Sequence, residues 1–234
     1  MSGAGKLGPL RQGRQRIAWK QMAFAGFQLV LDSACGPGWP DTASFHLPRL
    51  PVKMTPKKLS THTPRISVES PSRLSSVDID ELCDAAESGI RSGGGFGWLT
   101  PPPRSVMEDY WRGVQMIPER HLIVARLDKV IAGSCQIVSP PRNNEAQAFS
   151  CQLTTFFVAP WARGHGLAQM IVAEAEALAK SKGFTMISLD VRSTQDRAIQ
   201  SFEARGFIRY AVNDYYARVD SDFVSGFYYQ KELT

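Results

Sequence analysis

The clearest pattern of hydrophobic positions lies between residues 153 and 182. An apolar, β-branched run over residues 153–158 is typical of a strand. A short stretch with Gly164 and Gly166 follows, and apolar residues then recur at helical spacing to about Lys182. The sequence therefore predicts a strand, a tight glycine loop and the start of a helix in direct succession.

The same periodicities predict the other elements. Helical spacing marks two helices before this central strand and two after it, and alternation marks the remaining strands. Short connections favour antiparallel pairing among the strands before the glycine loop, whereas the strand after the crossover helix is expected to lie parallel to the central strand. The expected strands cover residues 66–68, 121–127, 130–138, 148–158, 185–192, 207–217 and 223–233, and the expected helices cover residues 78–90, 105–117, 166–182 and 194–205.

Polar residues at the helix ends predict where the helices begin. A small polar residue followed three positions later by an acidic one has the spacing of a capping box, in which each side chain bonds the backbone of the other. On the long helix after the glycine loop, Glu176 and Lys180 are expected to pair on the exposed side. The expected caps are Asp78 with Glu81, Ser105 with Glu108, and Ser193 or Thr194.

Residues 1–62 differ in composition from the rest of the chain. They are rich in Gly, Pro, Ser and basic residues, and residues 1–60 alone carry a net charge of +7 against +5 for the whole chain. This composition predicts a basic, disordered extension, or a true start at Met54, followed by one folded domain over residues 63–234. Because the positive charge belongs to the extension, the folded part is not expected to bind nucleic acid.

Several classes of protein do not fit the sequence. The apolar stretch over residues 23–31 is interrupted by Gly26 and Gln28 and falls short of the roughly 20 residues of a membrane helix, so no membrane role is expected. Basic residues before it leave a targeting sequence open. The four cysteines show no CxxC spacing, which predicts neither a metal site nor a disulfide frame and favours a reducing, cytoplasmic location.

The glycine loop is the strongest candidate for chemistry. A loop that opens a helix presents free backbone N–H groups and the positive end of the helix dipole to an anion, and Arg163 can grip a phosphate through two donors. A dinucleotide fingerprint would need a further glycine where Gln169 stands, and a nucleotide P-loop would need Gly-Lys-Ser/Thr. A phosphate-bearing ligand of another kind is therefore expected.

The residues of this loop do match the pattern Arg/Gln-x-x-Gly-x-Gly/Ala. On this pattern the chain from about residue 64 to residue 233 resembles the GNAT superfamily of acyl-CoA-dependent N-acyltransferases. The resemblance implies an α+β (mixed α/β) fold, with a mostly antiparallel central sheet, one parallel pair of strands that splay apart, and flanking helices. The matching residues are Arg163, Gly166 and Ala168, preceded by Val158-x-Pro160 and followed by Ala198-x-x-x-Phe202-x-x-x-Gly206-Phe207.

The resemblance also implies the ligands and the reaction. Acetyl-CoA would be the co-substrate, with its pyrophosphate on the glycine loop and its pantetheine arm along the end of the central strand. A primary amine of a small molecule or a peptide would attack the acetyl thioester directly. The partners would be acetyl-CoA and this amine, and a homodimer is compatible with the family. The residues implied to bind the cofactor are Phe157, Val158, Arg163, Gly164, His165, Gly166, Leu167, Ala168 and Gln195.

One position departs from the family pattern. Many members have a tyrosine four residues before the Gly-Phe pair, where it protonates the leaving thiolate, and this chain has Phe202. Glu145, at the turn into the central strand, and Tyr210 are the catalytic candidates that the sequence offers. Phe202 leaves a second hypothesis open, a non-catalytic acyl-CoA-binding module that serves sensing or interaction.

Overall fold

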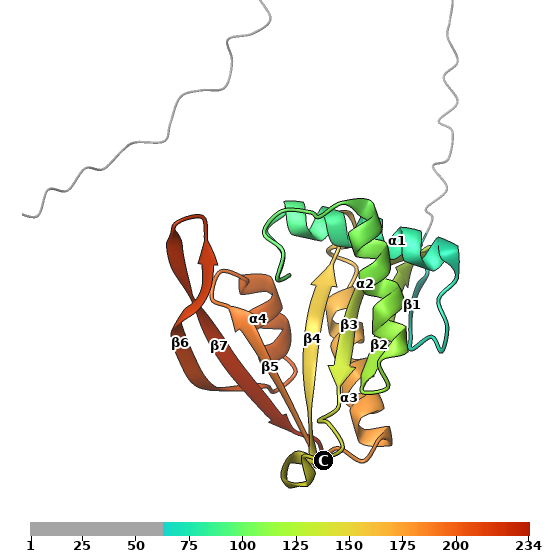
Figure 1. The fold of residues 1–234 in the computed structure, drawn as a ribbon. Coiled ribbons are helices and arrows are strands. Elements are labelled where there is room, and N and C mark those ends of the chain that lie inside the picture. The colour runs from blue at the N-terminus through green and yellow to red at the C-terminus, as the bar shows by residue number, and fades with distance from the viewer. Residues whose placement is uncertain (1–62) are drawn as a thin grey trace, which may run out of the picture. The chain divides into compact units, whose positions relative to one another are not determined.

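A computed structural model of the chain describes residues 63–234 (Figure 1). The expected extension over residues 1–62 and the alternative start at Met54 lie outside the described residues and stay predictions. Seven strands form one sheet in the order β1-β2-β3-β4-β5-β7-β6. The strands are β1 (Ile66–Glu69), β2 (Arg120–Leu127), β3 (Val130–Val138), β4 (Ser150–Val158), β5 (Met186–Arg192), β6 (Ile208–Val219) and β7 (Asp222–Glu232), and the helices are α1 (Ser76–Arg91), α2 (Arg104–Met116), α3 (Leu167–Ser181) and α4 (Asp196–Glu203), with short 3-10 turns η1 (Glu145–Gln147) and η2 (Pro160–Ala162).

The strand pairing confirms the predicted sheet. Strands β1 to β4 pair antiparallel with their neighbours, β4 pairs parallel with β5, and β7 pairs antiparallel with both β5 and β6. The parallel register runs only from Ser150–Met186 to Gln152–Ser188. Beyond that point β4 and β5 diverge, as Figure 1 shows, so the ladder bonds between them end in the middle of the sheet.

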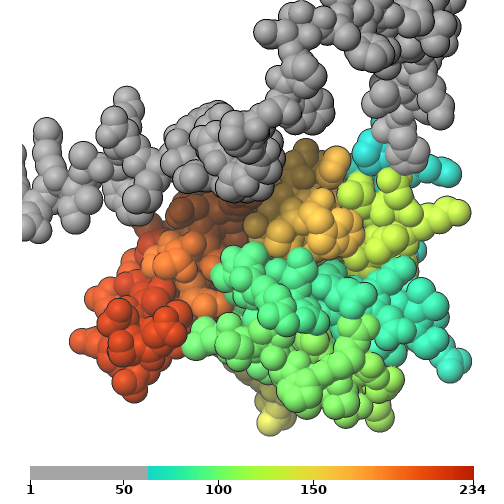
Figure 2. All heavy atoms as spheres, turned by 90° about the horizontal axis from the view of Figure 1, so that it is seen from above, coloured from blue at the N-terminus to red at the C-terminus, as the bar shows by residue number. Residues whose placement is uncertain are grey.

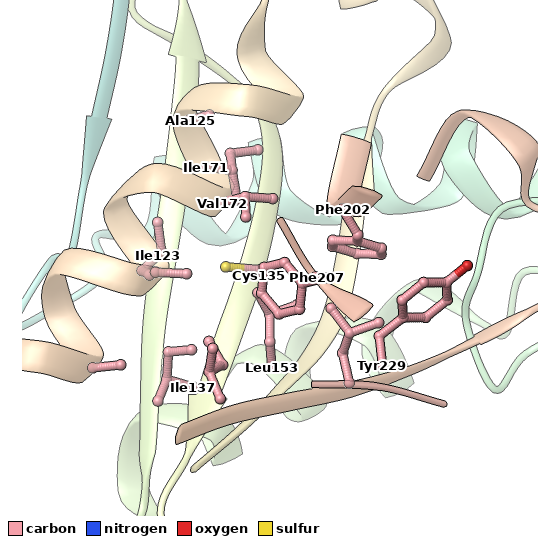
Figure 3. Packing of buried hydrophobic residues seen from close by; sticks show 14 of the residues in the cluster. Ile123, Ala125, Cys135, Ile137, Leu153, Ile171, Val172, Phe202, Phe207 and Tyr229 are labelled. Atoms are coloured by element: carbon pink, nitrogen blue, oxygen red, sulfur yellow. The ribbon is translucent and has the colours of Figure 1, made fainter. Parts of the chain in front are cut away.

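Each face of the sheet is covered by its own hydrophobic cluster. On one face, α3 and α4 pack side chains such as Ile171 and Phe202 against Cys135 and Leu153 (Figure 3). On the other face, α1 and α2 bury Leu82 and Trp111 against β2 and β3. The strand periodicity of two places alternate residues in the two clusters, which is why the strands have few polar positions in their centres.

The helix starts differ from the capping residues expected from the sequence. The first helix begins one turn earlier, because Ser75 is the N-cap and forms the reciprocal capping box with Asp78 rather than Asp78 with Glu81. The expected Ser105–Glu108 box is wrong, since α2 begins at Arg104 after Pro103, which has no side-chain cap. Ser193 and Thr194 are not caps either. The N-cap of α4 is Gln195, again without a side-chain cap bond.

The predicted pairing of Glu176 with Lys180 on an exposed helix face is also wrong. Glu176 is 7% exposed and binds two cations that come from later elements. Arg205 Nη2 lies 2.7 Å from Glu176 Oε2, and Lys231 Nζ lies 2.8 Å from Glu176 Oε1. Lys180 Nζ instead donates to the backbone carbonyl of Thr234. Glu176 therefore joins α3 to the end of α4 and to β7.

Within residues 63–234, no helix is both long and apolar enough to cross a bilayer.

Candidate functional site

A cavity of about 690 Å³ opens where β4 and β5 diverge. The end of α1 with its following loop, the end of β4, the loop before α3 and the start of α4 line it, within residues 89–94, 156–158, 162–169 and 194–201. Viewed from this end in Figure 2, the green segment after α1 lies beside the orange and red C-terminal segments. Segments from both halves of the domain thus form one site.

The loop before α3 has the geometry of an anion site. Gly164 has a φ of 86° and Gly166, the N-cap of α3, a φ of 78°. Side chains rarely adopt this left-handed conformation, so glycine is required by the backbone at both positions. Among residues 63–234, no protein acceptor is found for the backbone N–H groups of Gly166 and Leu167. These donors and the helix dipole favour a negative charge at this end of the cavity.

Two guanidinium groups reinforce that preference. Arg163 and Arg197 both line the cavity, and neither has a carboxylate partner in the part of the chain that the structure describes. Burial, followed by the neighbouring charge of Arg197, lowers the pKa of Arg163. A pair of cations without a counter-ion is stabilised by a multiply charged anion such as a pyrophosphate.

Two side-chain hydrogen bonds close the cavity wall. Arg163 Nη2 donates to Ser92 Oγ at 3.0 Å, and Gln195 Nε2 donates to the carbonyl oxygen of Gly93 at 2.6 Å. Each bond links the loop after α1 to a segment more than 70 residues later in the chain. Besides the role in ligand binding expected from the sequence, the side-chain amide of Gln195 holds the loop after α1 in place.

The end of β4 is irregular where it borders the cavity. The register between β3 and β4 shifts between Ser134 and Gln136, and Thr155 in the opposite strand has a φ of 52°. Such a conformation is strained for a β-branched residue, at a cost of about 1–3 kcal/mol, and strained residues cluster at ligand sites. The hydroxyl of Tyr110 lies 3.2 Å from Thr155 Oγ1 and helps to hold the bulge.

Two successive aromatic residues of β4 reach opposite faces of the sheet, as strand alternation requires. The bulge decides which ring takes which face, because it places Phe157 on the face opposite to Leu153. Phe156 packs on Phe202 with ring centroids 4.9 Å apart, whereas Phe157 packs on Phe96 at 4.8 Å. Both also line the cavity. Each ring therefore packs against a hydrophobic cluster and also borders the site.

The structure brings most of the predicted cofactor residues together. Around the cavity lie Phe157, Val158, Arg163, Gly164, Gly166, Leu167, Ala168 and Gln195. His165 is the exception, because its exposed side chain is not part of the lining. Only its backbone belongs to the anion-binding loop.

The two catalytic candidates from the sequence lie elsewhere. Glu145 is exposed in η1, which precedes the start of β4, whereas the cavity is lined by residues 156–158 at the opposite end of that strand. Tyr210 is 55% exposed on β6 and packs near Tyr228, at a centroid distance of 6.3 Å. Neither side chain lines the cavity, so the geometry gives neither one a place beside a ligand there.

Phe202 lies in the core rather than on the cavity surface. It is 2% exposed, and its ring centroid lies 4.9 Å from that of Phe156 and 5.7 Å from that of Phe207. Figure 3 shows Phe202 and Phe207 within the same cluster. Its neighbours Gln200 and Ser201 line the cavity instead. Position 202 therefore offers no proton donor, because phenylalanine has no acidic hydrogen and its ring does not reach the cavity.

Sequence reasoning missed the part of the site that comes from α1 and α4. Ser92, Thr194 and Arg197 carried no signal of a ligand site in the sequence. Their contribution follows from the sheet order, which places the start of α4 beside the end of α1. Among the described residues, no group of His, Cys, Asp and Glu side chains is arranged to hold a metal ion.

Comparison with known proteins agrees with this geometry. Residues 85–207, more than half of the chain, match the sequence model of the family described as Acetyltransferase (GNAT) family. A protein of Azospirillum brasilense, described as an uncharacterized N-acetyltransferase in the hisH-hisA intergenic region, is 54% identical over 132 residues, which cover 56% of this chain and 79% of that protein.

Solved structures share the fold at low identity. An N-acetyltransferase from Staphylococcus aureus Mu50 superposes with a TM-score of 0.63 at 13% identity, covering 73% of this chain and 99% of that one. A GNAT superfamily phosphinothricin acetyltransferase from Sinorhizobium meliloti, solved in complex with acetyl-CoA, gives a TM-score of 0.60 at 16% identity, covering 72% and 88%. At such identity the likeness establishes the fold.

Proposed function

The chain belongs to the acetyltransferase (GNAT) family, and on this premise we propose that it transfers the acetyl group of acetyl-CoA to a primary amine of a small molecule or a peptide. The observation that carries the proposal is the cavity at the divergence of β4 and β5, with the glycine loop and two unpaired arginines at one end. The loop and the arginines would hold the pyrophosphate, and the end of β4 would hold the pantetheine arm by its free backbone groups.

The reaction is a direct displacement at the thioester carbon. The substrate ammonium loses one proton to water, and the nitrogen lone pair then forms the C–N bond. The C–S bond breaks, its electron pair leaves with sulfur, and the second proton from nitrogen ends on the thiolate. Because a thiol has a pKa of about 8.5, the thiolate can leave without a protein acid, which is consistent with the phenylalanine at position 202.

Calorimetry and thiol release on the full chain test the proposal. We expect acetyl-CoA to bind with a stoichiometry of about one per chain, and a panel of primary amines to release free coenzyme A thiol in its presence. Absence of acetyl-CoA binding would contradict the proposed function. Binding without thiol release for any amine would favour the second candidate, a non-catalytic acyl-CoA-binding module, which the buried Phe202 supports.

We expect Arg197→Gln to weaken acetyl-CoA binding by about tenfold, because it removes one of the two cations from the cavity. The dissociation constant from calorimetry is the measurement. Arg209→Gln is the matched control, since Arg209 on β6 lies over the ring of Phe227 on β7 and does not line the cavity. Equal weakening in both variants would show that overall charge, rather than the cavity, sets the affinity.

We expect Phe202→Tyr to change kcat by less than about threefold, because a hydroxyl at this buried position is surrounded by Phe156 and Phe207 rather than by ligand. Thiol release at saturating acetyl-CoA measures it. A gain of about a hundredfold, which general acid catalysis can supply, would instead mean that the chain lacks only this proton donor.

Three expectations from the sequence accompany the proposal. Formation of a homodimer, absence of nucleic-acid binding and a cytoplasmic location stay predictions. The last draws support from Cys83, Cys135 and Cys151, which are buried free thiols. Burial, as the first cause, raises the pKa of Cys83 to about 11 and that of Cys151 to about 12, so these thiols are poor nucleophiles at neutral pH.

A further inference from the structure

A second polar site lies on the other face of the diverging strands, outside the cavity. Side chains alternate along β5, so Leu189 and Val191 enter the cluster beneath α3 and α4, and Asp190 faces the opposite way. Asp190 is only partly buried on that face. It therefore lies beside the gap between β4 and β5 and remains within reach of a solute.

Two neutral donors fix the carboxylate of Asp190. Gln152 Nε2 donates to Asp190 Oδ1 at 2.9 Å from across the gap, and the hydroxyl of Tyr216 donates to Asp190 Oδ2. Gln152 pairs with Ser188 in the last register position before the strands separate. Asp190 is thus held at the vertex of the divergence, where the reactive end of a cofactor in the cavity would approach this face.

The position of Tyr216 is built into the β6–β7 hairpin. The register between β6 and β7 shifts between Asn213 and Ala217, and the Tyr216 ring lies directly over Gly226. A Cβ atom at Gly226 would overlap the ring, so only glycine leaves room for it. Burial, followed by the bond to Asp190, raises the pKa of Tyr216, and the phenol therefore keeps its proton and acts as a donor.

The carboxylate has no cationic partner of its own. Within residues 63–234, Asp190 takes part in no ion pair. The basic residue nearest along the same face of β5, Arg192, donates through Nη2 to the carbonyl oxygens of Gly94 and Phe96, at 2.7 and 3.0 Å. Asp190 keeps free lone pairs, because each of its oxygens receives one protein donor.

Aromatic rings border the same carboxylate. Tyr228 stands edge-on to Tyr216 with centroids 6.1 Å apart, and it is the register partner of Asp190 across β5 and β7. A carboxylate with aromatic rings beside it is the combination that binds an ammonium group, through charge-assisted hydrogen bonds and cation–π attraction. Asp190 and the rings of Tyr216 and Tyr228 therefore favour a cation, and the negative charge of Asp190 repels a ligand carboxylate close to it.

We propose that Asp190, positioned by Gln152 and Tyr216, binds the acceptor as its primary ammonium cation and selects amines that carry no carboxylate next to that group. This inference rests on the proposed acetyl transfer, because it assigns the face of the sheet from which the amine reaches the thioester. Asp190 then orients the nitrogen toward the gap between β4 and β5, and the proton is lost to water as described above.

A binding experiment with unreactive probes tests the site directly. The full chain is saturated with coenzyme A, which carries no acetyl group, and titrated with n-butylammonium, 2-aminobutanoate or butan-1-ol, followed by ligand-observed NMR. We expect the butylammonium cation to bind at least about tenfold more tightly than the other two, and Asp190→Asn to remove this preference. A wild-type chain without the preference, or an Asp190→Asn chain that retains it, overturns the proposal.

Matched variants separate recognition from structure. Asp222→Asn removes the same charge from an exposed position at the end of the hairpin and is expected to keep the preference. Gly226→Ala leaves every polar group in place but displaces the Tyr216 ring, so we expect it to weaken cation binding as well. If Asp190→Asn and Gly226→Ala lower only the melting temperature and leave the preference intact, the cluster is structural and the proposal fails.

Acetyl-CoA titrations distinguish a failure of the cation site at Asp190 from a failure of the proposed acetyl transfer. Asp190 does not line the cavity, so Asp190→Asn is expected to bind acetyl-CoA within about twofold of wild type while the KM for a cationic amine rises about tenfold. A wild-type chain that does not bind acetyl-CoA contradicts the proposed function. The cation titration, repeated then without coenzyme A, still decides whether Asp190 is a cation site.

Discussion

Replacing Gly166 by valine is expected to lower the affinity for acetyl-CoA by about a hundredfold or more. The residue is the N-cap of α3 with a φ of 78°, a conformation that a β-branched side chain adopts only under strain. Relief of that strain would rotate the peptide and turn the N–H groups of the loop away from the anion. The new side chain would also stand where the cofactor pyrophosphate is expected to approach most closely.

Gly183→Val is the matched control for this variant. Gly183 has a φ of 85° at the other end of the same helix, and it does not line the cavity. In both variants, backbone strain is expected to lower the free energy of unfolding by a similar amount, about 1–2 kcal/mol, as measured by urea denaturation. Only Gly166→Val should lose acetyl-CoA binding in calorimetry. Equal affinities in the two variants would mean that the loop does not hold the cofactor.

The sheet and the loop were predictable because their signals are local. The alternation of residues 185–192 and the helix before it predicted a strand parallel to β4, and β4 and β5 do pair in parallel. Gly164 and Gly166 marked the loop because backbone conformations with positive φ favour glycine. Both inferences depend on residues close together in the chain, where spacing translates directly into geometry.

The contacts that join distant segments could not be predicted in the same way. Spacing along one helix suggested Lys180 as the partner of Glu176, whereas Arg205 and Lys231 reach it only because of the sheet order. The Asp190–Tyr216 contact depends on a register shift within β6, which no pattern in the sequence specifies. Helix caps failed because a capping pattern shows only that a side chain could bond a helix start. Ser75 rather than Asp78 caps α1, whereas α2 and α4 follow Pro103 and Gln195 without a side-chain cap bond.

The catalytic candidates show the same limit. Glu145 lies close to β4 in sequence, but a nine-residue strand separates its turn from the cavity at the other end. Sequence proximity to a strand carries no information about which end of that strand holds the site. Asp190, by contrast, lies in the middle of the alternating β5 pattern and faces away from the cluster beneath α3 and α4. A polar residue at such a position is expected in any half-buried strand, so it gives no signal of a functional site.

Removal of the Glu176 side chain is expected to produce the largest loss of stability. Glu176→Ala should lower the free energy of unfolding by about 2–4 kcal/mol, because it leaves Arg205 and Lys231 partly buried without their shared carboxylate. Urea denaturation measures the loss. Glu87→Ala is the control, since Glu87 pairs with Arg91 on the exposed side of α1 and should cost less than about 1 kcal/mol.

The same network predicts how stability depends on pH. Burial alone would raise the pKa of Glu176, but hydrogen bonds from Arg205 and Lys231 outweigh burial and lower the pKa below its ordinary value. A lowered carboxylate pKa contributes stability that is fully present above the ordinary glutamate pKa and is lost as the pH falls through the lowered folded-state value. Glu176→Gln should therefore flatten the acid limb of the unfolding free energy. An equally steep acid limb in this variant would place the acid sensitivity in another carboxylate pair, such as Asp78 with Arg126.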